Sequence, residues 1–488
     1  MSKTKNKSMK RCIKSLAKIL ICYFLLVGLF YWGSGDQLFF RTTETKPITP
    51  KDSAAVMTDG TSVSFTVIPS ADYLDRLSVL IGTYGRDNQG KLIMEVKDEQ
   101  GVLLAESTLE TSGLQDYVYQ DFSFESGIEN VKSEPLTVNI MARDVPAEQG
   151  VSLWYGTSIE AGKFEIEDMN GNVFAVNGEN HDGKICYAIA QRDVLWIGQW
   201  FWALAVGIGM LIAGYVLWNY HCIRVGKQTL YLKAVELYER YSFLVKQLVS
   251  RDFRRKYKRS VLGVCWSFLN PMLTMIVQYF VFSTIFKSSI ENFIVYLLSG
   301  IIIFNFFGES VGLGLTSIVD NAHLINKVYM PKVIYPLSRV LSSLINLVIS
   351  LVPLLIVMVV TGVPFTKSMV LIPIGLICLL VFCLGLSLLL SASMVFFSDT
   401  MFLWNVLSTL WMYLTPTFYP VDIIPDKWLP IYTMNPMYQF ITFLRSILLD
   451  GMAPSPELYL GCILSAGLMF IVGYWAFTKN QDKFVLYL

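Results

Sequence analysis

Residues 250–286 read SRDFRRKYKRSVLGVCWSFLNPMLTMIVQYFVFSTIF, and this stretch decides how the chain is organised. It begins with a cluster of cations and continues as an apolar run of about 25 residues, long enough to cross a bilayer as a helix. Cations beside such a run resist leaving the cytoplasm. The stretch therefore predicts a spanning helix with residue 250 inside and residue 287 outside.

Polar or amphipathic residues recur in the apolar run at a spacing of four, at Trp266, Asn270, Thr274 and Gln278. Residues four apart share one face of a helix. Polar side chains are costly against lipid, so this face is expected to meet other helices or to line a passage. Helix–helix packing and channel lining both remain open from the spacing alone.

The composition places the whole chain in a membrane. Of 488 residues, 53% are hydrophobic and 16% are charged, and the mean hydropathy is +0.49. The eight cysteines form no CxxC pair and the three histidines are scattered, so no metal site is expected. The pattern GxxxxGK[ST] is absent from the sequence, which excludes a phosphate-binding loop of that type in this chain.

The run RDFRRKYKRSVLGVCWSFLNPM resembles the first membrane segment in the membrane subunits of ATP-binding-cassette exporters for polysaccharides. That group carries O-antigens, teichoic acids and related cell-surface glycans. The resemblance covers roughly the last 260 residues and leaves the first 220 or so outside. The matching residues in the run are Arg251, Asp252, Tyr257, Ser260, Leu262, Gly263, Trp266, Asn270 and Pro271.

The resemblance implies a transport subunit rather than an enzyme. It implies two copies of a separate ATP-binding subunit that hold ATP and Mg, so that this chain has no cofactor of its own. A second copy of this chain, membrane lipids and a lipid-linked polysaccharide are the other expected partners, and no nucleic acid is expected. The expected location is the bacterial cytoplasmic membrane, with both termini cytoplasmic.

Residues 34–193 differ from the rest of the chain. Short alternating runs such as SVSFTVIP and KLIMEVKD are separated by turn residues, which predicts an extracytoplasmic all-β sandwich. Anchors at residues 1–33, expected to remain uncleaved, and 194–218 flank this domain. The domain carries roughly 26 acidic and 12 basic residues, so it suits a neutral glycan better than a phosphate-rich one. Aromatic residues in strands usually belong to a core, but weak sugar contact is proposed for Tyr117, Tyr119, Trp154 and Tyr155.

The predicted fold class is a polytopic α-helical membrane protein with six core spans in 261–488, two N-terminal anchors and the inserted sandwich. Residues 219–260 form an amphipathic pattern, expected to lie on the membrane surface. In the resembling family this helix contacts the ATP-binding subunit, and a short loop between the second and third core spans acts as the coupling helix. The coupling residues implied are Arg240, Arg251, Asp252, Asn321, Leu324, Ile325, Lys327, Tyr329 and Pro331. An anchor on anionic lipid and an ordinary inside loop are the plainer alternatives.

Three further expectations concern the core. Glu309 is a carboxylate well inside a predicted span and needs a partner, for which Arg339 on the next span is the candidate. A stripe of aromatic and hydroxyl side chains on the fifth span is expected either to pack or to line the channel with Trp266, Asn270, Thr274 and Gln278. The members of that second stripe are Trp404, Ser408, Trp411 and Thr415, with Tyr419 beyond them near the expected exit.

Two rival functions are compatible with the residues alone. One is a membrane glycosyltransferase or glycan-modifying enzyme with an exterior sugar-binding domain. Such enzymes usually need paired acids at the membrane boundary, and the core's exterior loops offer mainly Asp422, Asp426 and Asp450 without a paired motif. The other rival is a sensor whose sandwich binds sugar above a scaffold.

Overall fold

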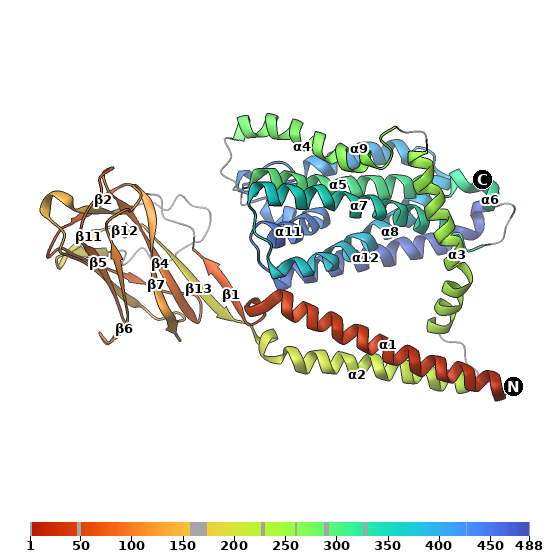
Figure 1. Cartoon of the computed structure of the whole chain (residues 1–488), viewed down its shortest axis with the longest axis horizontal. Helices are drawn as coiled ribbons and strands as arrows, with labels where there is room; N and C mark the ends of the chain where they lie inside the picture. The colour runs from red at the N-terminus through yellow and green to blue at the C-terminus, as the bar shows by residue number, and fades with distance from the viewer. Residues whose placement is uncertain are drawn as a thin grey trace. The chain divides into compact units, whose positions relative to one another are not determined.

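The computed structural model describes residues 2–45, 50–156, 173–225, 230–258, 261–286, 292–325, 327, 330–425 and 427–487. Figure 1 shows the chain as two compact units. Asp36–Trp202 forms one unit, and Met1–Gly35 together with Ala203–Leu488 forms the other.

The unit Asp36–Trp202 contains two antiparallel sheets. The first has the order β1 (Phe40–Glu44), β13 (Tyr187–Val194), β4 (Tyr73–Gly82), β9 (Val151–Gly156) and β12 (Lys184–Ile185), with β2 (Asp52–Met57) beside β9 and β7 (Val118–Glu129) beside β4. The second has the order β11 (Glu179–Asp182), β10 (Val173–Val176), β3 (Ser62–Val67), β8 (Leu136–Arg143), β5 (Lys91–Lys97) and β6 (Leu103–Glu110). Short 3-10 helices occupy η1 (Gly35–Leu38) and η2 (Ala147–Gln149).

Alternating side chains make the two sheets a sandwich. On β8, Leu136, Val138 and Ile140 are buried, while the residues between them are exposed or half-buried. These side chains share one core with Leu77 and Phe122 of the other sheet. A strand that alternates in this way has one face in a core and one face toward solvent. The all-β class predicted for this region is therefore confirmed.

The other unit is helical. Its long helices are α1 (Ser2–Ser34), α2 (Trp196–Val225), α3 (Leu230–Tyr257), α4 (Cys265–Phe286), α5 (Phe293–Thr316), α7 (Ile334–Thr361), α8 (Ile372–Phe396), α9 (Thr400–Tyr413), α11 (Pro436–Leu448) and α12 (Pro456–Asn480). Shorter elements are η3 (Val319–Asn321), α6 (Ala322–Ile325), η4 (Lys367–Leu371), η5 (Val421–Ile423), α10 (Leu429–Thr433), η6 (Gln481–Lys483) and α13 (Phe484–Tyr487).

Six helical segments among the described residues are long and apolar enough to cross a membrane: Trp196–Asn219, Cys265–Ser283, Phe293–Thr316, Ile334–Thr361, Lys367–Phe396 and Pro456–Tyr487. The first is the predicted second anchor, and the other five lie in the predicted core. The first anchor contributes a shorter apolar segment, Lys18–Ser34. The predicted class of a polytopic helical membrane protein is thus confirmed.

The fifth core segment differs in form from a plain span. Helix α9 has 14 residues, which at about 1.5 Å per residue is shorter than a hydrocarbon core of about 30 Å. The chain then leaves helical geometry through residues 414–420, of which Pro416 and Pro420 lack a backbone donor. It becomes helical again in α10 and α11, so the apolar segment is broken rather than continuous.

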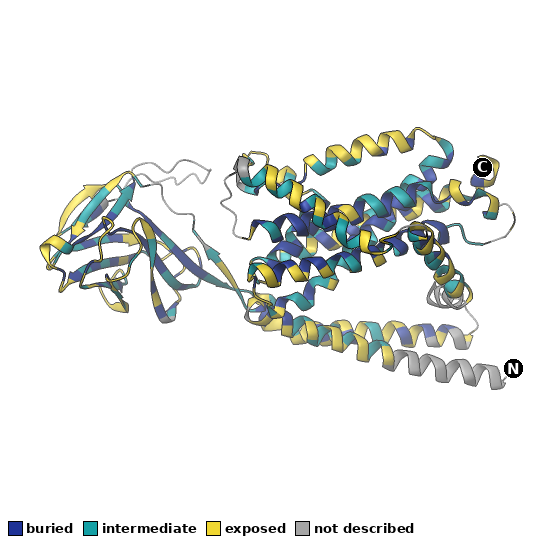
Figure 2. Cartoon of the chain, turned by 45° about the horizontal axis from the view of Figure 1, so that its top comes forward, coloured by how far each residue is buried: buried dark blue, intermediate teal, exposed yellow. Residues whose placement is uncertain are grey.

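Helix α5 is the centre of the helical unit. In its apolar window 78% of residues are buried, against 17% in α4, whose outer face is exposed in Figure 2. Helices α8 and α12 approach so closely that a Cβ on Gly473 would lie 1.9 Å from the backbone oxygen of Gly385. Such close approach through small residues is how membrane helices associate without a hydrophobic driving force.

Helices α1 and α2 pack against one another. The Tyr23 hydroxyl donates to the Ala205 carbonyl at 2.9 Å, and Phe24 lies over Gly209. At the end of α1, the Phe30 ring meets that of Tyr459 on α12, with centroids 5.6 Å apart. Helix α1 of the anchor pair therefore contacts the other helices through an aromatic pair at one end.

Candidate coupling site and passage

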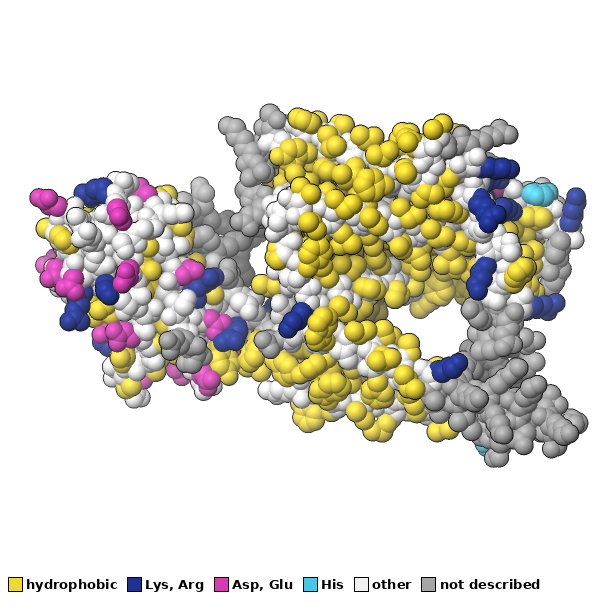
Figure 3. Space-filling view, viewed as in Figure 1, with side chains coloured by type: hydrophobic (Ala, Val, Ile, Leu, Met, Phe, Trp, Pro, Cys, Tyr) yellow, Lys and Arg dark blue, Asp and Glu magenta, His cyan; other side chains and the backbone are white. Residues whose placement is uncertain are grey.

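Cations gather at the end of the helical unit where α3 and α6 lie (Figure 3). The last turn of α3 carries Arg254, Arg255 and Lys256. Positive charge there complements the partial negative charge at the C-terminal end of a helix. The inward face of α3 points the other way, since Leu248 and Asp252 are buried.

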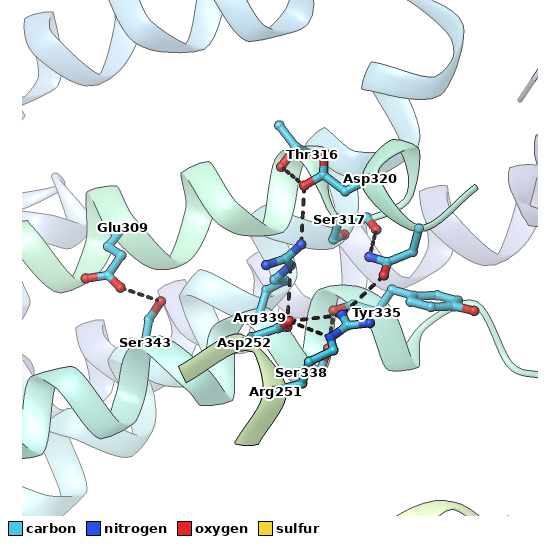
Figure 4. A network of polar contacts seen from close by, with 11 residues as sticks. Arg251, Asp252, Glu309, Thr316, Ser317, Asp320, Tyr335, Ser338, Arg339 and Ser343 are labelled. Carbon is cyan, nitrogen blue, oxygen red and sulfur yellow. Dashed lines mark hydrogen bonds and ion pairs between the residues drawn. The ribbon is translucent and has the colours of Figure 1, made fainter. Parts of the chain in front are cut away.

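An ion-pair network, buried at its centre and exposed at Arg251 and Asp320, joins α3 to α7 and to the segment after α5 (Figure 4). The Asp252 carboxylate lies 2.9 Å from Nη2 of Arg251 and 3.6 Å from Nε of Arg339. Arg339 also reaches Asp320 at 3.3 Å, and Thr316 donates to that carboxylate at 2.9 Å. Only 3% of the Asp252 side chain is exposed. Burial of a carboxylate is costly unless opposite charges lie beside it, and the two guanidinium groups supply them here.

Asn321 links this network to the predicted coupling segment. Its Oδ1 accepts a hydrogen bond from Nη2 of Arg251 at 3.3 Å, and its Nδ2 donates to the Ser317 carbonyl at 2.7 Å. Asn321 is buried, as is Ile325. These two residues therefore hold the segment in place from inside the protomer rather than presenting a surface.

Other predicted coupling residues are more accessible. Lys327 and Arg240 are exposed, and Leu324 and Pro331 are half-buried. Tyr329 lies outside the described residues. A surface for a partner at this end consequently consists of the exposed cations and their neighbours, with the buried network beneath.

The end of the chain packs under the same segment. Lys332 donates to the Gln481 carbonyl, and its ammonium lies 5.6 Å from the Phe484 ring centroid. Phe484 is fully buried and meets the Phe477 ring edge-on. Burial of Lys332 lowers its pKa, an effect that the nearby Asp482 carboxylate opposes. These contacts were not foreseen, because the last ten residues are too few to show a helical or strand period.

The predicted Glu309–Arg339 ion pair is wrong. Glu309 instead accepts from Nζ of Lys256 at 2.8 Å and from Nδ2 of Asn346 at 2.6 Å, with Ser343 at 3.5 Å. The reason is that α3 lies against α7 and was not considered as a source of partners. Asp252 and Lys256 lie one turn apart on α3. Asp252 pairs with Arg339, and Lys256 pairs with Glu309.

A second set of hydrogen bonds extends from Glu309 toward α4. The Tyr257 hydroxyl bonds to Ser267 and donates to Oδ1 of Asn346 at 2.9 Å. Ser350 donates to the Ser267 carbonyl at 3.0 Å. One stripe of α7, comprising Arg339, Ser343, Asn346 and Ser350, thereby connects the ion pairs to the first core span. Its spacing of four, three and four residues was readable in the sequence.

The predicted stripe on α4 lies on or near an exposed face. Trp266 is 45% exposed and Asn270 is exposed, whereas Thr274 and Gln278 are half-buried. Exposed polar side chains on an otherwise apolar helix are costly against lipid. Of the two readings, this face favours a passage or a partner over packing inside the protomer.

The stripe predicted on α9 is only partly compatible with channel lining. Trp404 and Thr415 are buried in the protomer, so lining by these two is wrong for the described structure. Trp404 packs on Phe307 with centroids 5.7 Å apart, and Thr415 accepts from Nδ2 of Asn435 at 2.9 Å. Ser408 and Trp411 are half-buried, and Nε1 of Trp411 donates to Oδ1 of Asn435 at 2.8 Å.

Arg445 organises the break between α9 and α11. Its guanidinium donates to the carbonyls of Pro416 at 2.7 Å, Thr417 at 2.6 Å and Tyr296 at 3.1 Å. The group also lies 3.4 Å from the Tyr296 ring centroid. Non-helical backbone at membrane depth needs such donors for its free carbonyls. Tyr419, half-buried at this break, donates to the Tyr413 carbonyl at 2.9 Å.

The four aromatic residues singled out in the β unit separate into two groups. Tyr155 points inward, packing against the sandwich core and the Phe174 ring. Tyr117 is half exposed and meets Trp154 edge-on, with centroids 5.1 Å apart. Tyr119 is half-buried. Among the described residues, no group of three or more His, Cys, Asp and Glu side chains is placed to hold a metal ion.

Comparison with known proteins covers the second half of the chain. Residues 244–449 match the family described as ABC-2 type transporter. The O-antigen export system permease protein RfbA of Myxococcus xanthus is 32% identical over 255 residues, which are 51% of this chain and 96% of that protein. A protein of the same name from Klebsiella pneumoniae is 29% identical over 243 residues, 49% of this chain and 93% of its own length.

Proposed function

We propose that this chain moves a lipid-linked cell-surface polysaccharide. The premise is that it belongs to the ABC-2 type transporter family and is the permease subunit of a polysaccharide exporter. The relatives' names refer to O-antigen, which is the cargo class we propose here. The match to this chain extends over 96% and 93% of the lengths of those relatives, which supports the proposal. The same relationship supports a separate ATP-binding subunit in two copies, which would hold ATP and Mg.

The topology that we propose places both termini in the cytoplasm and residues 34–193 outside. The cations of residues 1–18, those of α3 and Lys327 then all lie inside, in agreement with the charge bias of membrane proteins. The membrane would be the bacterial cytoplasmic membrane, where such an exporter acts on a precursor made inside the cell.

A second copy of this chain would complete the passage. Helix α4 and the outer face of α9 expose polar side chains, including Asn270 and Asn405, beside large apolar ones such as Phe280 and Phe402. Two such faces brought together bury the apolar side chains and give the polar ones a hydrated path. Among the members of the predicted stripes, the exposed Trp266 and Asn270 and the half-buried Ser408 remain suited to this role.

The buried network that includes Asp252 carries the coupling proposal. One carboxylate contacts α3 and α7, and Arg251 extends the network to Asn321 at the coupling segment. Nucleotide-driven movement of a docked subunit would therefore shift α3 and α7 together, which carries the movement to the spans.

Reconstitution tests this function. The chain purified alone in lipid vesicles is expected neither to hydrolyse ATP nor to transport. Addition of an ATP-binding-cassette ATPase subunit from the same cell is expected to give hydrolysis and passage of lipid-linked polysaccharide across the vesicle membrane. Hydrolysis by this chain alone, or transport without a second kind of subunit, would contradict the proposal.

A further inference from the structure

The outer face of the first sheet carries a small aromatic surface distinct from the sandwich core. Leu153 and Ile81 of the adjacent strands β9 and β4 point into the core. Because neighbouring residues in a strand point to opposite faces, Trp154 and Gly82 lie on the other side. A Cβ on Gly82 would come within 2.7 Å of Nε1 of Trp154, so the indole lies against bare backbone.

One exposed tyrosine contacts this indole, and a second, Tyr84, follows Gly82 by two residues. Tyr117 contacts Trp154 edge-to-face at 5.1 Å, and half of the Tyr117 side chain is exposed. Tyr84 is equally exposed, and the Arg86 guanidinium lies 5.2 Å from its ring centroid. Tyr84, Tyr117 and Trp154 are called the aromatic platform below.

One carboxylate holds the two tyrosines in place. Oδ1 of Asp116 accepts hydrogen bonds from the backbone N–H groups of Thr83 at 2.6 Å and Tyr84 at 3.0 Å. This ties the turn that carries Tyr84 to the residue before Tyr117. Both tyrosines have left-handed backbone conformations, with φ of 57° and 58°. Such conformations are unfavourable for bulky residues and persist where surrounding contacts hold them, often at binding sites.

The chemistry of the platform points to a saccharide. Rings of Tyr and Trp offer flat apolar faces together with polar edges, which suit the C–H faces and hydroxyl groups of a sugar ring. The surrounding residues Arg86, Asp116 and Gln115 supply donors and acceptors for hydroxyl groups. Acidic residues exceed basic ones about twofold across residues 34–193, which disfavours a phosphate-rich ligand.

We propose that the aromatic platform binds a neutral saccharide unit of the polymer that the permease exports, with the rings stacked on its C–H faces. The identification of that polymer as the ligand rests on the proposed function. Residues Tyr119 and Tyr155 are not part of the site, because the first is half-buried beside it and the second faces the core.

Binding to the full-length chain in phospholipid nanodiscs tests the site. Glycoside detergents are avoided because their sugar headgroups would compete. The probes are neutral mannan, glucan and galactan oligosaccharides, polysaccharide extracted from the source cell's envelope, and poly(glycerol phosphate). We expect a neutral probe or the envelope polysaccharide to bind, and Tyr117→Ala to weaken that binding by about tenfold through loss of one stacked ring.

Matched variants separate the site from general damage. Tyr117→Phe keeps the ring and the same backbone strain, so its affinity is expected to stay within about twofold of wild type. Leu104→Ala removes an exposed side chain from β6, in the other sheet, and is expected to leave binding unchanged. Unfolding temperatures of all variants establish that the domain remains folded, and Trp154→Phe provides a second ring-preserving substitution.

Three results would overturn the proposal: no binding of any probe, equal binding by wild type and Tyr117→Ala, or preference for poly(glycerol phosphate). Capture of a protein rather than a glycan by the platform would overturn it as well. The assay contains neither ATP nor the second subunit, so its failure leaves the exporter function to be judged by reconstitution alone.

Discussion

The Asp252 carboxylate lies 3.6 Å from Nε of Arg339, joining the helix before the first core span to the third core span. The side chains are 3% and 10% exposed, so neither charge is well solvated. Removal of Arg339 leaves Asp252 with Arg251 alone, and removal of Asp252 leaves Arg339 with Asp320 alone, so either change weakens the balance of charge around a buried group. Through this pair, a small displacement of α3 is consequently transmitted to α7.

Replacement of Asp252 by Asn is expected to uncouple the exporter. The substitution removes the negative charge between two guanidinium groups, and because Arg339 keeps Asp320 and Arg251 is 40% exposed, we expect a cost of about 1–3 kcal/mol. Surface glycan should fall at least tenfold, measured by antibody labelling of intact cells, while the second subunit continues to hydrolyse ATP.

The double variant Asp252→Asn, Arg339→Gln provides the check on this pairing. If the two residues act through one another, the double variant should be less damaging than the sum of the two single changes. Gln247→Ala, a change at an exposed and uncharged residue of the same helix, is the matched control. If the loss of surface glycan in the double variant equals the sum of the losses in the two single variants, the two residues act independently.

Removal of the Glu309 carboxylate should weaken the link between α5, α3 and α7. Glu309→Ala leaves Lys256 and Asn346 without their acceptor, whereas Glu309→Gln keeps an acceptor for Asn346. We expect Glu309→Ala to lower the unfolding free energy by about 1–3 kcal/mol and Glu309→Gln by less. The midpoint of thermal unfolding in detergent measures both, with Lys258→Gln as control. Equal losses for Ala and Gln would argue against the hydrogen bond to Asn346.

Alanine substitutions at two glycines of α5 test the packing around Arg445, because only one of the two glycines lies against that side chain. A Cβ on Gly300 would lie 2.9 Å from Nη2 of Arg445, whereas a Cβ on Gly308 would meet nothing within 4 Å. Gly300→Ala is expected to displace the guanidinium and destabilise the protein by about 1–3 kcal/mol. Gly308→Ala should be neutral or stabilising by up to about 1 kcal/mol through helix propensity. Similar unfolding midpoints for both variants would contradict the packing described.

Glycan binding by the aromatic platform should depend on pH, because the Asp116 carboxylate holds the platform in place. Hydrogen bonds from the backbone N–H groups, chiefly that of Thr83, lower the pKa of this carboxyl below its ordinary value of 3.8. A carboxyl with a lowered folded-state pKa stabilises the fold above the unfolded value and loses that contribution as pH falls through the folded value. Glycan affinity and domain unfolding temperature should therefore drop on acidification below about pH 4. The same titration of Asp116→Asn should show a shallower fall, and an unchanged slope would remove Asp116 from the account.

Much of the architecture follows from patterns in the sequence. The runs that contain Val138 and Val96 alternate because their strands have one face in the sandwich core, and alternation is visible without coordinates. Hydrophobic length likewise indicates α5 and α7. The interrupted segment after α9 is harder to delimit, because its carbonyls are satisfied by Arg445, 29 residues beyond Pro416.

The site was predicted less completely than the fold. The need of Glu309 for a partner was readable, but the identity of that partner depends on how α3 packs on α7, which no local pattern specifies. Trp404 and Thr415 share a stripe with Ser408, yet α9 turns the first two toward Phe307 and Asn435. Spacing establishes which residues share a face, and only tertiary packing establishes what that face meets.

The pairing of β1 with β13 has a consequence for how the sandwich is carried. Phe40 lies opposite Val194, so the strand that leads into the domain and the strand that leads out of it are neighbours. A module whose two ends meet can be excised and its flanking helices rejoined by a short linker, without reaching across the protein. Evolution or an engineer can thus exchange this sandwich for another domain while the helices of the permease stay as they are.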